Sequence, residues 1–152
     1  MKKGIAIALL AAILLCFAAC GEKTYSVDTE ALGAALNEAG IFLDTLAELP
    51  AGMLPNFYSV AENVTAVLYR GTGATAEEIT IFDALDADSA ATVAETAQKR
   101  LTELAGVYDQ YNATEAARLR NAICLRRGRY VVVCVCNDNA AAQKIIDQFF
   151  AA

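Results

Sequence analysis

The segment of residues 130–136 constrains the fold more than any other part of the chain. It reads Tyr-Val-Val-Val-Cys-Val-Cys. Side chains alternate between the two faces of a strand, so this strand would be apolar on both faces. A strand of that kind lies inside a sheet whose two faces are both covered. The sequence therefore predicts a sheet packed against other elements on each side of this strand.

The order of elements around that strand predicts the fold class. Strand patterns at residues 64–69 and 78–82 are joined by a turn at residues 71–74 and followed by a long helix to about residue 108. The pattern repeats from residue 122 with a strand, the 130–136 strand and a closing helix through residue 150. We predict an α+β fold: a four-stranded antiparallel sheet from two strand-strand-helix units, plus an N-terminal helix at residues 29–39.

The secondary structure of two regions outside the repeated units is less constrained by the sequence. A short helix is expected at residues 113–120, and residues 41–60 are interrupted by Pro50, Gly52 and Pro55, which favours short helical turns. The duplicated units would cover one face of the sheet. The N-terminal helix either covers the second face or leaves it as a surface for a ligand or partner.

The first 20 residues resemble a bacterial lipoprotein signal peptide. Lys2 and Lys3 precede an apolar run from Gly4 to Ala19, and Cys20 follows two alanines, as in a lipobox. The resemblance implies a diacylglyceryl thioether on Cys20 and attachment to the outer face of the cytoplasmic membrane. An uncleaved anchor and a secretory signal cut before Cys20 are the alternatives. The chain then divides into a signal peptide (residues 1–19), a lipidated cysteine with its tether (20–27) and one domain (28–152).

The charge of the chain argues against nucleic acid as a partner. Removal of the two leader lysines takes the net charge from −6 to −8, and phosphate backbones are bound by basic surfaces. The chain contains no histidine, which removes the commonest general base and metal ligand. We find no nucleophile-elbow or phosphate-loop motif. We therefore expect no cofactor, no metal and no catalytic residue.

Three cysteines remain outside the leader: Cys124, Cys134 and Cys136. The last two share one face of the predicted strand, where a bridge between them is poorly placed. We expect all three to be reduced, buried side chains. The alternative is a metal or redox pair at Cys134 and Cys136.

Five arginines form the clearest anomaly of charge, because no acidic residue lies between them. They are Arg118, Arg120, Arg126, Arg127 and Arg129. One hypothesis is a contact surface for an anionic lipid, a wall polymer or an envelope protein. The alternative is a solvated hairpin tip with ion pairs to the many carboxylates.

Two further groups favour structural roles. The acidic residues Glu77, Glu78, Asp83, Asp86 and Asp88 are expected to cap helices and to complement helix dipoles. A calcium loop is disfavoured because Ala90 and Ala91 stand where a ligand and a glycine belong. Tyr108 and Tyr111 are expected to pack at the end of the long helix.

The chain also resembles the bacterial domain of unknown function 4358. The resemblance is carried by short motifs distributed from the second strand to the closing alanine-rich helix. They are Ala76-Glu77-Glu78-Ile79-x-Ile81-Phe82, Lys99-Arg100-Leu101, Tyr111, Glu115, Asn121-Ala122 and Gly128-x-Tyr130-Val131. It covers roughly residues 32–150, implies a short extracytoplasmic lipoprotein and supplies no catalytic residues.

These observations lead to one expected function and two alternatives. We expect a membrane-anchored, extracytoplasmic lipoprotein that acts as a non-enzymatic binding or interaction module. The alternatives are an envelope hydrolase that uses carboxylates and a small inhibitor or accessory subunit of an envelope enzyme. Two carboxylates converging in a deep cleft would favour the hydrolase. A flat apolar patch beside arginines would favour a protein partner.

Overall fold

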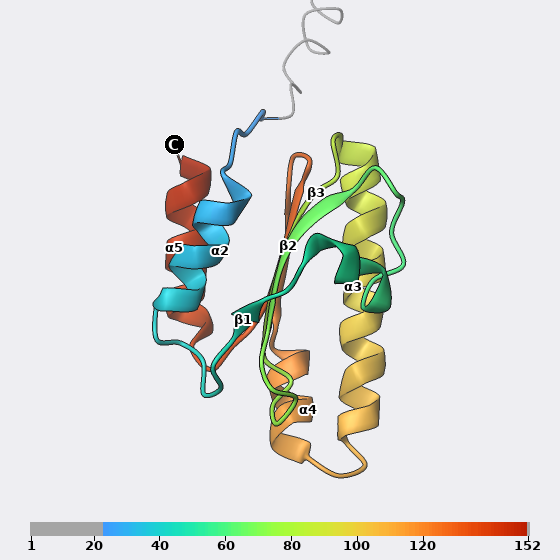
Figure 1. The fold of residues 1–152 in the computed structure, drawn as a ribbon, viewed down its shortest axis with the longest axis vertical. Helices are drawn as coiled ribbons and strands as arrows, with labels where there is room; N and C mark the ends of the chain where they lie inside the picture. The colour runs from blue at the N-terminus through green and yellow to red at the C-terminus, as the bar shows by residue number, and fades with distance from the viewer. Residues whose placement is uncertain (1–22, 152) are drawn as a thin grey trace, which may run out of the picture.

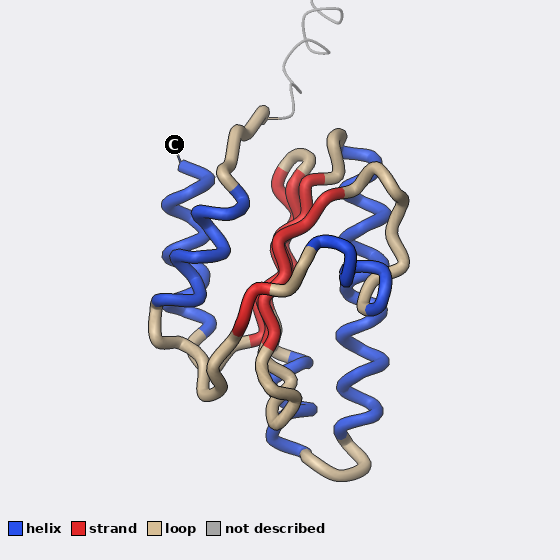
Figure 2. Tube along the Cα trace, in the orientation of Figure 1, coloured by secondary structure: helices blue, strands red, loops and turns tan. Residues whose placement is uncertain are grey.

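The protein folds into three layers, with one antiparallel sheet between two layers of helices (Figures 1 and 2). The structure is a computed structural model, and it describes residues 23–151. The leader and Cys20 lie outside the described residues. The helices are α2 (Thr29–Glu38), the 3-10 helix η2 (Ala51–Asn56), α3 (Ala87–Tyr108), α4 (Ala113–Arg120) and α5 (Asn139–Ala151). The strands are β1 (Ala47–Glu48), β2 (Thr65–Arg70), β3 (Glu78–Asp83), β4 (Ile123–Arg127) and β5 (Tyr130–Val135).

The sheet has five strands within the described residues, so the predicted count of four is wrong. The strand order is β1-β2-β3-β5-β4, and every neighbouring pair is antiparallel. The additional strand β1 contains only two residues, Ala47 and Glu48, which pair with Arg70 and Tyr69. Two residues are too few to show an alternating pattern, which explains the error. The helical turn expected in residues 41–60 is present as η2.

Strand β5 is covered on both faces, as its sequence predicts. Val131, Val133 and Val135 belong to the core beneath α3 and α4. Tyr130, Val132 and Cys134 belong to the core beneath α2 and α5. The N-terminal helix α2 thus covers the second face together with α5 (Figure 1). Each fully buried valine stabilises the fold by about 1.5–3 kcal/mol.

Side-chain caps fix where the helices α2, α3, α4 and α5 begin. The carboxylate of Asp28 accepts from the Ala31 amide at 2.9 Å, and that of Asp86 accepts from the Ser89 amide at 2.7 Å. Asn112 caps α4 in the same way. Each cap satisfies an amide that the first turn leaves unpaired. The capping role expected of Asp86 is confirmed.

The segment that precedes α2 lies against the tip of the β4–β5 hairpin. The Val27 amide donates to the Tyr130 hydroxyl at 3.2 Å, and the Tyr25 ring meets the Phe150 ring edge-on at 5.3 Å. Gly128 at the tip has φ +54°, and a Cβ there would approach the Tyr25 ring to 3.2 Å. The glycine therefore serves both the turn and the close approach of the segment.

Candidate functional site

A buried carboxylate, Glu78, organises the first charged group of the structure. Glu78 is the first residue of β3 and only 1% exposed. It accepts hydrogen bonds from the Tyr58 hydroxyl and from Arg70. Arg100 donates to its two oxygens at 2.8 and 3.0 Å. We call these four residues the Glu78 cluster.

The fold brings the Glu78 cluster together from four separate segments. Arg70 stands directly opposite Glu78 in the β2–β3 register, Arg100 comes from the middle of α3, and Tyr58 follows η2. Burial and the charge of Glu78 raise the pKa of Tyr58 well above 10.0, so this phenol stays protonated and donates. Burial alone would lower the pKa of Arg100, but the neighbouring Glu78 carboxylate raises it above its ordinary value.

A second charged group ties together one end of the sheet. Glu77 accepts from the Leu43 amide at 3.0 Å and from the Asp44 amide at 2.8 Å. Glu115 accepts from the Ala76 amide at 2.8 Å and from Arg118 at 2.6 Å. Arg118 also lies 3.9 Å from Glu77. We call Glu77, Glu115 and Arg118 the Glu77 cluster.

Glu77 and Glu78 were expected to cap helices or complement their dipoles, and this prediction is wrong. Both are buried, as is Glu115, because each carboxylate is surrounded by arginine or backbone donors that replace water. The sequence motif Ala76 to Phe82 contains both glutamates. Its hydrophobic alternation does not show that the fold brings arginines into contact with them. None of the three carboxylates opens into a cleft, since each is at most 5% exposed.

The five arginines singled out in the sequence do not form one patch. Arg118 and Arg120 lie on α4, whereas Arg126, Arg127 and Arg129 lie at the tip of the β4–β5 hairpin, at the opposite end of the sheet (Figure 1). Arg120 pairs with Asp109, Arg127 with Asp147 at 2.5 Å, and Arg129 with Asp83 at 2.9 Å. Arg126 donates to the Ala87 carbonyl at 3.3 Å. Contact of the hairpin arginines with an external anion stays a prediction.

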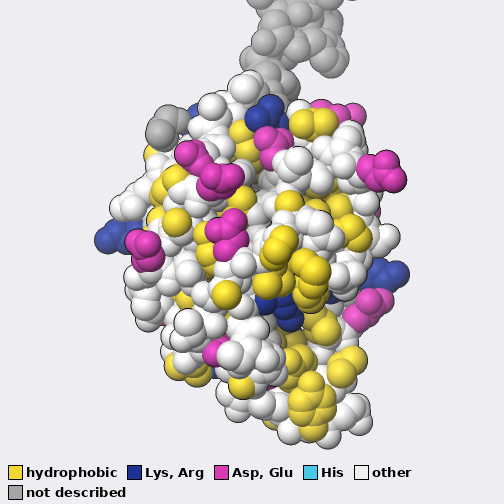
Figure 3. All heavy atoms as spheres, in the orientation of Figure 1, with side chains coloured by type: hydrophobic (Ala, Val, Ile, Leu, Met, Phe, Trp, Pro, Cys, Tyr) yellow, Lys and Arg dark blue, Asp and Glu magenta, His cyan; other side chains and the backbone are white. Residues whose placement is uncertain are grey.

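Hydrophobic side chains gather in a band beside the Glu78 cluster. Figure 3 shows them running from the middle of this face to its lower end, with basic atoms among them. Met53 is 38% exposed and Tyr111 is 68% exposed. Phe57 and Tyr108 are partly buried. Arg70 stacks on the Phe57 ring at 4.6 Å. We call these five residues the aromatic band.

The tyrosines of the aromatic band pack on each other. The Tyr108 and Tyr111 rings lie 5.1 Å apart and are tilted by 37°, so the expected packing is confirmed. Partial burial and the nearby Tyr111 raise the pKa of Tyr108, while the charge of Arg70 acts in the opposite direction. Arg70 therefore lies within electrostatic reach of both the rings and Glu78, and it joins the band to the cluster.

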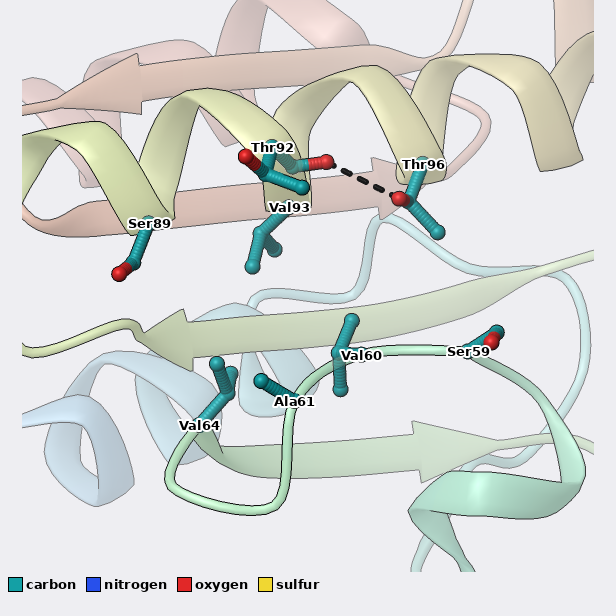
Figure 4. A pocket seen from close by; sticks show the side chains of 8 residues that line it. All are labelled: Ser59, Val60, Ala61, Val64, Ser89, Thr92, Val93 and Thr96. Atoms are coloured by element: carbon teal, nitrogen blue, oxygen red, sulfur yellow. Dashed lines mark hydrogen bonds between the residues drawn. The ribbon is translucent and has the colours of Figure 1, made fainter.

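An apolar pocket of about 200 Å³ lies between the loop before β2 and the first half of α3 (Figure 4). Val60, Ala61 and Val64 line it from the loop, and Val93 faces them from the helix. The hydroxyls at its edge are those of Ser59, Ser89, Thr92 and Thr96. No carboxylate lines this pocket. An adjacent pocket of about 240 Å³ shares Ser59 and Thr96 and continues to Tyr58 and Arg100.

Two kinds of feature are absent from residues 23–151. No group of three or more Cys, Asp or Glu side chains there is arranged to hold a metal ion. No helix in the same range has the length and apolar character needed to cross a bilayer. In the described part of the chain, the site therefore consists of arginines, a tyrosine, carboxylates and aromatic rings.

Comparison with known protein families places this arrangement in a recognised group. The family model described as a domain of unknown function (DUF4358) matches residues 47–136. The chain belongs to this family. The match covers β1 to the end of β5 and includes both charged clusters, and it is narrower than the resemblance noted from the motifs. The searches of curated proteins and of solved structures found no significant match.

Proposed function

We propose that this DUF4358 protein is a lipoprotein held on the outer face of the cytoplasmic membrane by a lipid on Cys20. The basic start, the apolar run and Ala18-Ala19-Cys20 support this proposal. Incorporation of a labelled fatty acid into the full chain tests it, with Cys20→Ser as the variant. We expect label in the parent chain and none in the variant. A parent chain that takes up no label would refute the proposal.

We further propose that the protein is a non-enzymatic binding module whose partner, an envelope protein with an acidic and apolar segment, contacts the aromatic band. The supporting observation is that two guanidinium groups share the single carboxylate of Glu78, and that one of them, Arg70, stacks on the partly buried Phe57 ring. Glu103, the acidic residue of the adjacent pocket, pairs with Lys99 at 3.8 Å. The Glu78 cluster therefore keeps a positive charge that an acidic partner would complement.

The composition of the band fits this role. Aromatic residues, Met and Arg are enriched at protein interfaces, and Tyr and Arg are frequent among the few residues that dominate the binding free energy. Arg70 and Arg100 are already oriented by Glu78, so binding would cost little side-chain entropy.

Site-specific photo-crosslinking in intact cells tests the proposed surface. A photo-reactive residue at Tyr111 or Met53 should give one discrete crosslinked product. The same residue at Leu43, which is exposed in the loop after α2, should not. Arg70→Met should reduce the product formed from position 111. Equal crosslinking from positions 43 and 111 would refute the band as the binding surface.

A further inference from the structure

A groove runs along one face of α3, between this helix and the loop that leads into β2. It consists of the apolar pocket of about 200 Å³ and the adjacent pocket of about 240 Å³, which meet at Ser59 and Thr96. The lining residues of the helix have the spacing of neighbours on one helical face. They are Ser89, Val93, Thr96 and Arg100. We call the two pockets together the α3 groove.

One end of the α3 groove is apolar. Val93 points from the helix towards the loop, where Val60 and Val64 line the opposite wall (Figure 4). The Thr96 hydroxyl donates to the Thr92 carbonyl at 2.9 Å, and the Thr92 hydroxyl donates to a carbonyl of the preceding turn at 3.4 Å. Both hydroxyls are therefore satisfied within the helix, so this end favours apolar ligand groups.

The other end of the α3 groove is cationic. Arg100 lines it together with Tyr58 and Phe57. The Arg100 guanidinium donates to the Tyr58 hydroxyl and to both oxygens of Glu78, and it lies 4.4 Å from the centre of the Tyr58 ring. A guanidinium has five N–H donors. Within residues 23–151, these three hydrogen bonds leave two donors for a ligand.

The surroundings of Arg100 favour the binding of one negative charge. Its side chain is only 15% exposed, so its attraction to an added carboxylate would be weakly screened by water and salt. Glu78 is shared with Arg70, and the three groups together carry a net positive charge. At the rim, Glu103 opposes this charge, but Lys99 offsets it at 3.8 Å. This end of the groove thus complements a monovalent anion.

We propose that the α3 groove binds a small aliphatic carboxylate, with the hydrocarbon chain at Val60, Val64 and Val93 and the carboxylate at Arg100. Val93 and Arg100 are seven positions apart in α3, which is about 10 Å along the helix axis. Long helical side chains lean towards the helix N-terminus, so a chain of a few carbon atoms is long enough. Burial of the chain supplies binding free energy, and the guanidinium selects for the carboxylate.

This ligand site differs from the proposed protein-binding surface. Phe57 belongs to both, but Met53, Tyr108 and Tyr111 do not line the groove. A small acid in the groove requires no envelope partner. The inference therefore goes beyond the proposed function and does not depend on it, because crosslinking from position 111 and binding of an acid are measured separately.

Titration with hexanoate tests the proposal, followed by NMR of the full chain with methyl-labelled valines in detergent micelles near neutral pH. Hexanoate should shift the signals of Val60, Val64 and Val93 in a saturable way, while those of Val132, on the other face of the sheet, stay in place. Acetate lacks the chain and 1-hexanol lacks the charge, so each should bind at least about tenfold more weakly. The absence of a saturable shift, or equal binding of hexanoate and either control, would overturn the proposal.

Two exposed positions provide variants that should leave the fold intact. Ala61→Phe, in the loop, should fill the apolar end and weaken hexanoate binding at least about tenfold. Glu103→Gln removes a like charge at the cationic end and should strengthen binding about two- to fivefold. Glu30→Gln, on the exposed side of α2, is the matched control and should bind like the parent. Unchanged binding by Ala61→Phe, or weaker binding by Glu103→Gln, would overturn the proposal as well.

Discussion

The Glu78 cluster and the Glu77 cluster contain the same kinds of side chain in inverse proportion. Two guanidinium groups surround one carboxylate in the first. In the second, one guanidinium lies near two carboxylates, and backbone amides and the Thr75 hydroxyl supply the remaining donors. The Glu77 cluster thus uses its charges to hold loops together. The Glu78 cluster keeps an excess of positive charge beside a surface that side chains of a partner can reach.

The two clusters also differ in the hydrogen-bond donors that they leave available to a partner. All the donors that the structure shows at Glu77 and Glu115 come from this chain, so the Glu77 cluster is complete within it. The guanidinium groups of Arg70 and Arg100 retain N–H donors beyond those that Glu78 accepts, because each guanidinium has five. Substitutions in the two clusters should therefore differ in their effects on folding and on binding.

The largest expected effect is that of Glu78→Gln. It leaves Arg70 and Arg100 without a counter-charge in a largely buried site, and removal of one partner from a buried ion pair costs about 3–5 kcal/mol. Urea unfolding followed by circular dichroism measures the change. Arg100→Met, which leaves Glu78 paired with Arg70, should cost less. A variant with unchanged stability would contradict the assigned role of Glu78.

Glu77→Gln should cost less, about 1–3 kcal/mol of unfolding free energy. The amide oxygen of the new side chain can still accept from one backbone donor, but its nitrogen cannot accept from the other. The loop at residues 41–46 should loosen locally, as seen by faster hydrogen exchange at Leu43 and Asp44. Binding at the aromatic band should be unaffected. A loss of crosslinking from position 111 in this variant would remove the distinction between the clusters.

Tyr58→Phe should lower the free energy of unfolding by about 1–2 kcal/mol near neutral pH, because the hydrogen bond from the Tyr58 hydroxyl to Glu78 is lost. The folded protein holds the pKa of Tyr58 well above 10.0. The contribution of this phenol is thus present below pH 10 and is lost as the pH rises above it, where the unfolded chain ionises first.

The pH dependence supplies the measurement for Tyr58. The parent should lose stability more steeply than Tyr58→Phe between about pH 10 and pH 11. Tyr111→Phe, in which the ring is exposed, is the matched control and should follow the parent. Identical slopes for the parent and Tyr58→Phe would show that Tyr58 is not held in its protonated form.

The smallest effect is expected from replacing Arg126, Arg127 and Arg129 together with Gln. The ion pairs of Arg127 and Arg129 are exposed or partly exposed, and Arg126 donates to a backbone carbonyl at the surface, so each substitution should cost within about 0.5 kcal/mol. If these arginines contact an anionic surface, binding of the full chain to anionic vesicles or wall polymer should weaken in the variant. Parent binding should also fall steeply with salt. Binding that is insensitive to both changes would leave the hairpin tip without such a role.

Sequence patterns predicted the parts of the fold that depend on local or short-range information. The strand that begins at Tyr130 follows from its periodicity, the cap at Asp86 from its residue type, and the pairing of β2 with β3 from the turn residues between them. β1 could not be predicted from the sequence, because two residues are too few to show an alternating pattern. The charged clusters could not be predicted either, since Glu78, Arg100 and Tyr58 are far apart in the sequence and meet only in the folded protein. From hydrophobicity alone, polar residues such as Glu78 and Arg100 are assigned to the solvent-exposed surface.

Residues 23–27 pack against the hairpin tip, so the domain begins close to Cys20, the position proposed to carry the lipid. Only two residues, Gly21 and Glu22, stand between Cys20 and Lys23, and the three steps from Cys20 to Lys23 span at most about 11 Å. A lipid on Cys20 would thus confine the protein to a thin layer, where it diffuses in two dimensions and meets membrane-bound partners at high effective concentration. An interface that is weak in solution would be well occupied there. Dissociation constants measured without the anchor would therefore understate the occupancy at the cell surface.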